Sequence, residues 1–150
     1  MALPPRIDAK AVRERIGPYA DKKATLDERT RTYADLIGFV PPRIEARIAV
    51  TGALDPALLD MQEKMREHAM YPKCFDVKTA QLMLFGMLLM DGSDAAVLHG
   101  IAARRAGASF EELQAVISLC FLFRGLPAAN RGAEILANIA RREADSDAQG

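Results

Sequence analysis

The stretch LMLFGMLLM, residues 82–90, decides the fold, because nine consecutive non-polar residues must be buried. It is much shorter than the roughly 20 residues that a helix needs to cross a bilayer, so it predicts a buried helix and not a membrane span. Asp76 is placed to cap the start of this helix, and Asp91-Gly92 is placed to end it.

A second apolar segment lies downstream, where Ser109 and Glu112 have the S-x-x-E spacing of a capping box. The helix that they open is apolar nearly all round from Ala115 to Phe123 and should end at Gly125. Two helices without a polar face need burial on every side. A single 150-residue domain has too little interior for both, so we expect a homo-oligomer. The alternative, one central helix surrounded by the others, accounts for the first segment only.

The rest of the chain has frequent helix punctuation and no sustained alternation of apolar and polar residues, which predicts an all-α fold, a helical bundle. Residues 1–37 are expected to form an N-terminal arm with one polar helix, residues 38–142 the helical domain, and residues 143–150 a disordered tail. Besides the two apolar helices, the expected helices cover residues 21–37, 42–50, 56–70, 94–106 and 126–142.

The chain has 20 acidic and 20 basic residues and therefore no formal net charge. Without a basic surplus, nucleic acid and anionic membranes are not expected partners. Arg43 and Arg47, four residues apart on an expected helix, are most simply a solvated face. Cys74 and Cys120 lie far apart, and the first fifteen residues are too charged for a signal peptide, so we expect a cytoplasmic protein.

His99 has an unusual setting. On the helix expected over residues 94–106 its same-face neighbours are alanines, while Leu98 and Ile101 face away. The space above an imidazole ringed by methyl groups is either filled by another helix or kept for a ligand, and a satisfied interior histidine is the ordinary outcome. The alanines are Ala95, Ala96, Ala102, Ala103 and Ala106.

Four features occur in order in the second half of the chain. Val77-Lys78-Thr79 opens the first apolar helix, and His99 follows about twenty residues later. The segments AGASFEE, residues 106–112, and RGLPAAN, residues 124–130, come next. In this order and spacing, the region from Phe75 to Ile139 resembles the carboxymuconolactone decarboxylase family, which also contains the alkylhydroperoxidase D-type thiol peroxidases.

The resemblance implies an all-helical subunit that assembles into homotrimers or homohexamers, with a cofactor-free pocket for a small-molecule substrate near the subunit contacts. It also implies that His99 belongs to the active site. We expect no metal, because the second histidine, His68, has no partner at metal-ligand spacing.

The chain departs from the peroxidase members at two positions. Those members carry a C-x-x-C pair that ends four residues before the histidine, because one thiolate attacks the peroxide and a second thiol resolves the product. Here the two positions are Gly92 and Ala95, so thiol peroxidase chemistry at this site is excluded. Cys120 lies in an apolar helix, where its thiol pKa should be raised and its reactivity low. Only Cys74 leaves the peroxidase hypothesis open.

Gln81 is a further departure, because related sequences usually place a glutamate on this helix, facing the histidine. An amide can hydrogen-bond the ring but cannot take its proton. Decarboxylase-type members also tend to have an arginine just before that glutamate and an acidic residue four residues before the histidine, where this chain has Ala80 and Ala95.

The favoured hypothesis is a cofactor-independent lyase or isomerase of the carboxymuconolactone decarboxylase type, acting on a small anionic lactone or ring-derived acid. His99 would transfer the proton, and Gln81 would orient its ring. Arg124 and Lys78 are candidates to bind the substrate's carboxylate. For these two the ordinary alternatives are a helix C-terminal cation and a solvated first-turn lysine. The alternative function is a non-catalytic oligomer that binds a small molecule.

Overall fold

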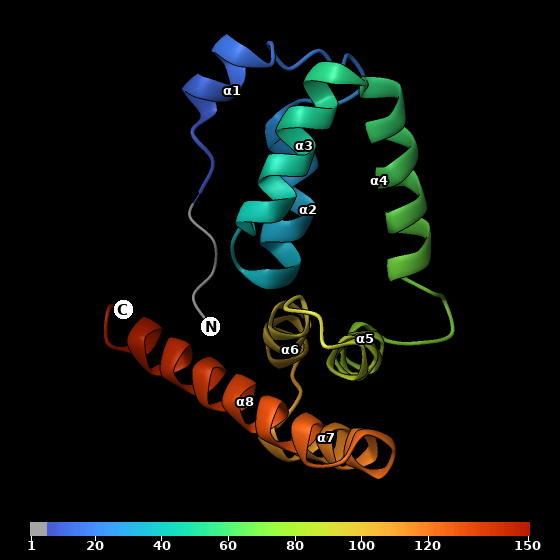
Figure 1. Ribbon diagram of the computed structural model, residues 1–150, viewed down its shortest axis with the longest axis vertical. Coiled ribbons are helices and arrows are strands. Elements are labelled where there is room, and N and C mark those ends of the chain that lie inside the picture. The colour runs from blue at the N-terminus through green and yellow to red at the C-terminus, as the bar shows by residue number, and fades with distance from the viewer. Residues whose placement is uncertain (1–5) are drawn as a thin grey trace. The chain divides into compact units, whose positions relative to one another are not determined.

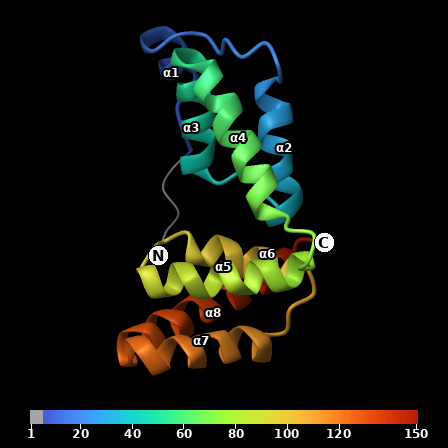
Figure 2. The same ribbon diagram turned by 90° about the vertical axis from the view of Figure 1, so that its right-hand side faces the viewer.

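The structure, a computed structural model, describes residues 6–150 and contains eight α-helices and no strand within that range (Figures 1 and 2). The prediction of an all-α fold is therefore confirmed. None of the helices described combines the length and the apolar character needed to cross a bilayer. The helices are α1 (Ala9–Arg15), α2 (Leu26–Ile37), α3 (Pro42–Leu54), α4 (Pro56–Met70), α5 (Val77–Asp91), α6 (Ala96–Arg105), α7 (Phe110–Arg124) and α8 (Leu126–Asp147).

The chain divides after Met70 into two compact units. We expected a boundary after Ile37, with a polar helix from residue 21 in an N-terminal arm. The structure instead includes α2 in the first unit, because Tyr33, Leu36 and Ile37 on one face of this helix are buried. The helix also begins later than expected, at a capping box formed by Thr25 and Glu28.

The first unit packs α2, α3 and α4 side by side, with α1 against α3 (Figures 1 and 2). Its core is formed by Tyr33, Ile48 and Leu59, one residue from each of the three longer helices. A helix over residues 42–50 was expected, and α3 continues to Leu54. The helix predicted over residues 56–70 is confirmed as α4, which Asp55 caps by accepting a hydrogen bond from the Leu58 N–H.

Asp60, a buried carboxylate on α4, connects three elements of the first unit. It accepts hydrogen bonds from Lys23 (2.7 Å), Lys64 (2.8 Å) and Arg29 (3.0 Å). These three donors, Lys23 foremost, hold the pKa of Asp60 well below its usual range. Arg29 also binds Asp21 at 2.8 Å, so the loop before α2 is tied to the same network.

Glu63, the second buried carboxylate of α4, accepts hydrogen bonds from the Tyr33 hydroxyl at 2.9 Å and from the Arg47 guanidinium. The expectation that Arg47 lies on a solvated face is therefore wrong, because the buried carboxylate needs a cationic partner. The Arg66 guanidinium stacks 3.6 Å from the centroid of the Tyr33 ring. Burial raises the pKa of Tyr33 to about 12, so its hydroxyl stays protonated and donates at neutral pH.

The second unit is a four-helix arrangement in which α5 and α6 form one layer and α7 and α8 the other (Figures 1 and 2). Close packing between α7 and α8 within their layer depends on a small residue: a Cβ on Gly132 of α8 would lie 2.6 Å from Cγ1 of Ile117 on α7. Lys78 of α5 contacts Glu112 of α7, and farther along Cys120 contacts Gly86, so α5 and α7 run in the same direction.

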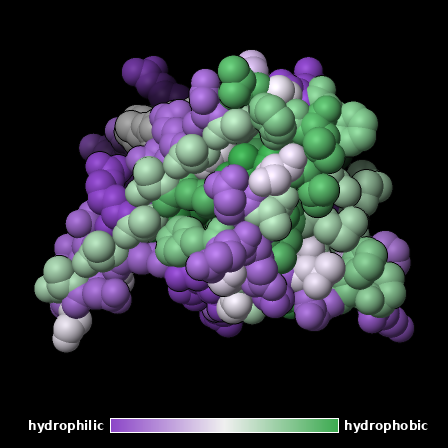
Figure 3. Space-filling model, turned by 90° about the horizontal axis from the view of Figure 1, so that it is seen from below, coloured by the Kyte–Doolittle hydropathy of each residue, from purple (hydrophilic) through white to green (hydrophobic). Residues whose placement is uncertain are grey.

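The two apolar helices are not fully buried within one chain. Met83 and Met87 of α5 are exposed. Helix α7 exposes several large apolar side chains, of which Phe123 is 82% exposed. Figure 3, seen from the side on which α7 and α8 lie, shows hydrophobic residues gathered over much of that face. The exposed large apolar residues at the C-terminal end of α7 and the start of α8 are Leu119, Phe121, Leu122, Phe123 and Leu126.

The C-terminal segment differs from the prediction. We expected the last helix to end near Arg142 and a disordered tail to follow, but α8 continues to Asp147. One cause is the ion pair between Arg104 of α6 and Glu143, in which Nε and Oε1 lie 2.8 Å apart. This contact holds the first residue of the expected tail against another helix.

Candidate functional site

Packing of α5 against α6 brings Gln81 and His99 together. Gln81 is fully buried, and its Oε1 lies 2.7 Å from Nδ1 of the half-buried His99 ring. Asp76 fixes where α5 begins by accepting a hydrogen bond from the Thr79 N–H. The contact is the one that an orienting role for Gln81 requires, while the catalytic roles of both residues stay predictions.

The hydrogen bond constrains the protonation of the imidazole. With Oε1 of Gln81 as the acceptor, Nδ1 of His99 must carry a proton and donate it. Nε2 is then the nitrogen at which a proton is gained or lost. Because an amide oxygen does not take up the proton, this hydrogen bond favours one tautomer of the ring and provides no proton relay.

The alanine wall beside His99 is largely taken up by packing. Ala96, Ala102 and Ala103 are each exposed by 1% or less, and Ala96 and Ala103 belong to the main hydrophobic core of the unit. Ala95 and Ala106 are half-buried. The methyl groups of Ala96, Ala102 and Ala103 are therefore covered by neighbouring residues, and the space next to them is not kept for a ligand. The ring itself remains partly exposed.

The segment before α6 occupies the positions where peroxidase members carry their two cysteines. Gly92 ends α5 in the left-handed conformation with φ of 71°, and Ser93 Oγ accepts a hydrogen bond from the Ala95 N–H at 3.2 Å. The helix starts at Ala96, slightly later than the expected residue 94. There is no sulfur in this segment to attack a peroxide.

An ion pair that sequence reasoning missed fixes this segment to α8. Nη2 of Arg131 lies 2.8 Å from Oδ1 of Asp94, and Nε of Arg131 is buried without a hydrogen-bond partner among the described residues. The two residues are 37 positions apart, so no local pattern predicts their contact. Asp94 is the first residue of the helix expected over residues 94–106, and its carboxylate is paired across the unit.

Lys78, a predicted substrate-binding residue, lies one helical turn before Gln81 and is paired. Its Nζ donates to Oε1 of Glu112 at 2.8 Å. This hydrogen bond raises the pKa of Lys78 and lowers that of Glu112. A substrate carboxylate at Lys78 must therefore compete with, or share the ammonium group with, an existing partner.

Arg124, the other predicted substrate-binding residue, does not lie near the Lys78–Glu112 ion pair of the same chain. It is the last residue of α7 and is exposed. Glu112, which contacts Lys78, lies near the other end of the same helix, roughly 18 Å away at the 1.5 Å rise of an α-helix. Lys78 and Arg124 of one chain therefore do not bind the same small carboxylate.

The remaining candidate groups are the cysteines and a possible metal site. Burial raises the pKa of the Cys120 thiol, as predicted, and its Sγ donates to the Gly86 carbonyl at 3.6 Å. Cys74 is exposed. Across residues 6–150, the structure contains no group of three or more His, Cys, Asp or Glu side chains that could hold a metal ion.

Comparison with known proteins gives one match. The model of the carboxymuconolactone decarboxylase family matches residues 56–138, which is more than half of the chain and extends from α4 into α8. This range includes Gln81, His99, Lys78 and Arg124. No curated protein and no solved structure matches the chain.

Proposed function

Because the chain belongs to the carboxymuconolactone decarboxylase family, we propose that it is a cofactor-independent lyase or isomerase of that type. Its substrate is a small anionic lactone or ring-derived acid, and it works in the cytoplasm as a homotrimer or homohexamer. His99 transfers the proton and Gln81 orients it.

The observation that carries this proposal is the hydrogen bond between Gln81 and His99, which spans 2.7 Å and joins two helices. A buried amide with no other evident catalytic use is well placed to hold an imidazole in one orientation. The His99 side chain is half-buried and therefore not sealed from solvent. Histidine suits this role because its ordinary pKa, near 6.5, allows both protonation states at neutral pH.

The proposed decarboxylation consists of the loss of carbon dioxide followed by a proton transfer from His99. The bond between the ring carbon and the carboxylate breaks, carbon dioxide leaves, and the electron pair is delocalised into the unsaturated lactone as a dienolate. The imidazolium of His99 then donates the proton on Nε2 to a carbon of the dienolate. The neutral ring, with Nδ1–H still bonded to Gln81, regains a proton from solvent before the next turnover. An isomerase would instead begin with the neutral His99 ring, which removes a proton from a substrate carbon and returns it to a different carbon of the resulting dienolate.

Lys78 is the better of the two carboxylate contacts. It lies three residues before Gln81 on α5, whereas Arg124 lies at the far end of α7. Replacement of Lys78 by Met should raise the KM for carboxymuconolactone about tenfold, because a charge-assisted hydrogen bond is lost. Arg124→Met is the matched control and should leave KM unchanged. A larger rise in KM for Arg124→Met than for Lys78→Met would indicate that Arg124 of a neighbouring subunit binds the carboxylate instead.

The direct test uses carboxymuconolactone as the probe and the release of carbon dioxide as the readout. His99→Gln should lower kcat at least a hundredfold, in line with the usual contribution of general acid–base catalysis. His68→Gln, which changes the exposed histidine of α4, is the control and should retain activity. Wild-type turnover in the His99 variant would overturn the proposal, provided circular dichroism shows both proteins folded.

The second candidate is a non-catalytic oligomer that binds a small molecule. Two observations favour it: Gln81 replaces a group that could relay protons, and the alanine wall near His99 is filled by packing. It predicts that the lactone raises the melting temperature without forming product. Product formation by the wild type, lost in His99→Gln, rejects it.

A thiol peroxidase is the third and weakest candidate, because it depends on the exposed Cys74 alone. Peroxide consumption that disappears in Cys74→Ser would support it. Consumption that persists in this variant could not involve that thiol.

A further inference from the structure

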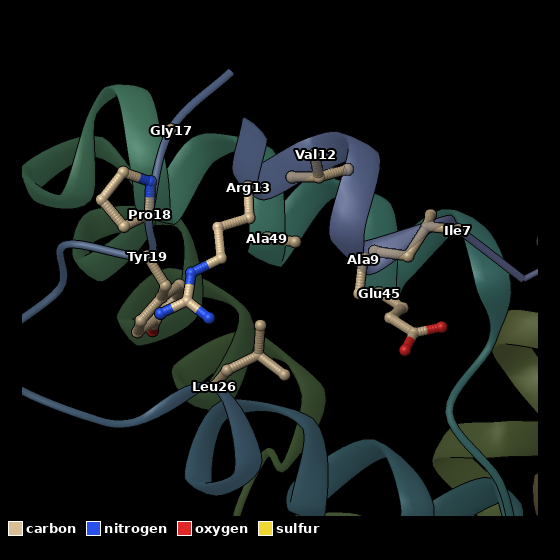
Figure 4. Close-up of a pocket in the computed structure, with 10 residues that line it drawn as sticks. All are labelled: Ile7, Ala9, Val12, Arg13, Gly17, Pro18, Tyr19, Leu26, Glu45 and Ala49. Carbon is tan, nitrogen blue, oxygen red and sulfur yellow. The ribbon is translucent and has the colours of Figure 1, made fainter. Parts of the chain in front are cut away.

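A cavity in the first unit is separate from the residues of the proposed active site. It has a volume of about 350 Å³ and lies beside α1 and α3 (Figure 4). None of the site residues proposed above lines it. Its lining consists of Ile7, Ala9, Val12, Arg13, Gly17, Pro18, Tyr19, Leu26, Glu45 and Ala49.

Most of the cavity wall is apolar and held in place. Val12 of α1, Leu26 of α2 and Ala49 of α3 contribute aliphatic side chains from three elements. The Tyr19 hydroxyl lies 3.0 Å from the Ala24 carbonyl and can donate to it, so the polar end of this side chain already has a partner. A Cβ on Gly52 would overlap the Tyr19 ring, so the glycine lets this ring lie directly on α3. The part of the wall formed by Tyr19 and α3 is therefore in place before any ligand binds.

The charges at the cavity are unevenly distributed. Glu45 is already paired, because its Oε1 lies 2.9 Å from Nη2 of Arg6. Arg13 has no hydrogen-bond or ion-pair partner within residues 6–150, and Figure 4 shows its guanidinium extending into the cavity near Tyr19 and Leu26, away from Glu45. An apolar space with one uncompensated guanidinium fits an anion with an apolar body.

We propose that this cavity binds a small amphipathic monocarboxylate, whose carboxylate pairs with Arg13 and whose hydrocarbon chain lies against Val12, Leu26 and Tyr19. At the roughly 30 Å³ that a water molecule occupies in the liquid, the cavity has room for about a dozen non-hydrogen atoms. A saturated carboxylate of eight carbons has that size. The planar fork of arginine pairs with both carboxylate oxygens, which an alcohol of the same length lacks.

Isothermal titration of the full chain with octanoate and with 1-octanol tests the proposal. Octanoate should bind with a dissociation constant below about 1 mM, and 1-octanol at least tenfold more weakly. Arg13→Gln should weaken octanoate binding at least tenfold and leave 1-octanol binding unchanged. Arg15→Gln is the matched control, because Arg15 is an exposed arginine of the same helix that does not line the cavity.

A second variant tests the place of binding. Ala9 lines the cavity but is exposed, so Ala9→Phe should fill the space without unfolding the unit and should abolish binding of both ligands. Absence of saturable octanoate binding to the wild type, equal affinity for the two ligands, an unchanged Arg13 variant or an unchanged Ala9 variant would each overturn the proposal. His99→Gln should bind octanoate as the wild type does, so this result is independent of the proposed reaction.

Discussion

At the scale of single residues, the chemistry proposed for the second unit depends on Gln81 and His99. A buried amide beside an imidazole provides orientation, and one titratable group remains for the chemistry. Family members with a glutamate at this position have a second proton carrier. We therefore expect the proposed reaction to be slower in this chain than in a member with that glutamate, and we expect reprotonation of the His99 ring to limit its rate.

Replacement of Gln81 by Glu tests this limit. The carboxylate can accept the Nδ1 proton of His99 and return it, so kcat for carboxymuconolactone should rise about tenfold to a hundredfold, within the range of general acid–base catalysis. Steady-state kinetics across pH 5–9 gives the measurement. Gln81→Met, which removes the hydrogen bond and keeps the volume, should lower kcat instead. A Glu variant no faster than the wild type would show that proton relay at this position is not limiting.

Asp60 gives a residue-scale prediction about stability. Its folded-state pKa is depressed, so its contribution is present above the ordinary value of about 3.9 and is lost as the pH falls below it toward the folded-state pKa. At pH 7, Asp60→Asn should therefore lower the urea midpoint, and the difference from the wild type should shrink at pH 3. Glu67→Gln, an exposed carboxylate on the same helix, should change the midpoint little at either pH. A difference independent of pH would contradict the ionic explanation.

At the scale of elements, the ends of the helices follow from short-range chemistry. Asp76 caps α5, and Ser109 and Glu112 form the predicted capping box of α7. Each uses a side-chain oxygen to satisfy backbone N–H groups that a helix leaves unpaired in its first turn. How closely the helices approach one another depends instead on which residues lack a side chain at the contact, as Gly132 does against Ile117.

Gly132→Ala tests the contact between α7 and α8. The new Cβ would lie 2.6 to 2.9 Å from three side-chain carbons of buried Ile117, so overpacking should cost about 1–3 kcal/mol of unfolding free energy. The gain in helix propensity, about 1 kcal/mol, offsets part of this cost. In an Ile117→Ala background the cost should vanish, which a double-mutant cycle in urea measures. A stabilised single variant would mean that α7 and α8 can move apart at this contact without cost.

At the scale of the whole molecule, the apolar faces of α5 and α7 bear on assembly. Burying a side chain the size of Leu or Phe gains about 1.5–3 kcal/mol, and Leu119 and Phe123 are 63% and 82% exposed in the single chain. They lie four residues apart and therefore on the same helical face. This supports the proposed homotrimer or homohexamer, because the subunit contacts would cover that face.

The double variant Leu119→Glu and Phe123→Glu should dissociate the assembly. Light scattering after size-exclusion chromatography should give the mass of a trimer or hexamer for the wild type and 16.4 kDa for the variant. Gln114→Glu, an exposed polar position on α7, is the control and should keep the wild-type mass. An unchanged mass in the double variant would place the subunit contacts elsewhere, and a monomeric wild type would overturn the proposed assembly.

The sequence by itself determined the helices of the second unit and their order. The apolar run of residues 82–90, the capping residues and Gly125 act on neighbours a few positions away, so their effect can be predicted from the chain alone. The candidate pair of His99 and Gln81 also came from sequence, through the family resemblance. Their hydrogen bond is consistent with that assignment.

Only the tertiary structure decided the boundary after Met70, the pairing of Arg47 with Glu63 and of Asp94 with Arg131, and the packing that fills the alanine wall. It also separated Lys78 from Arg124 and formed the cavity beside Arg13. Each of these depends on contacts between residues far apart in the chain. Local propensity carries no information about such contacts, because they form only when whole helices pack.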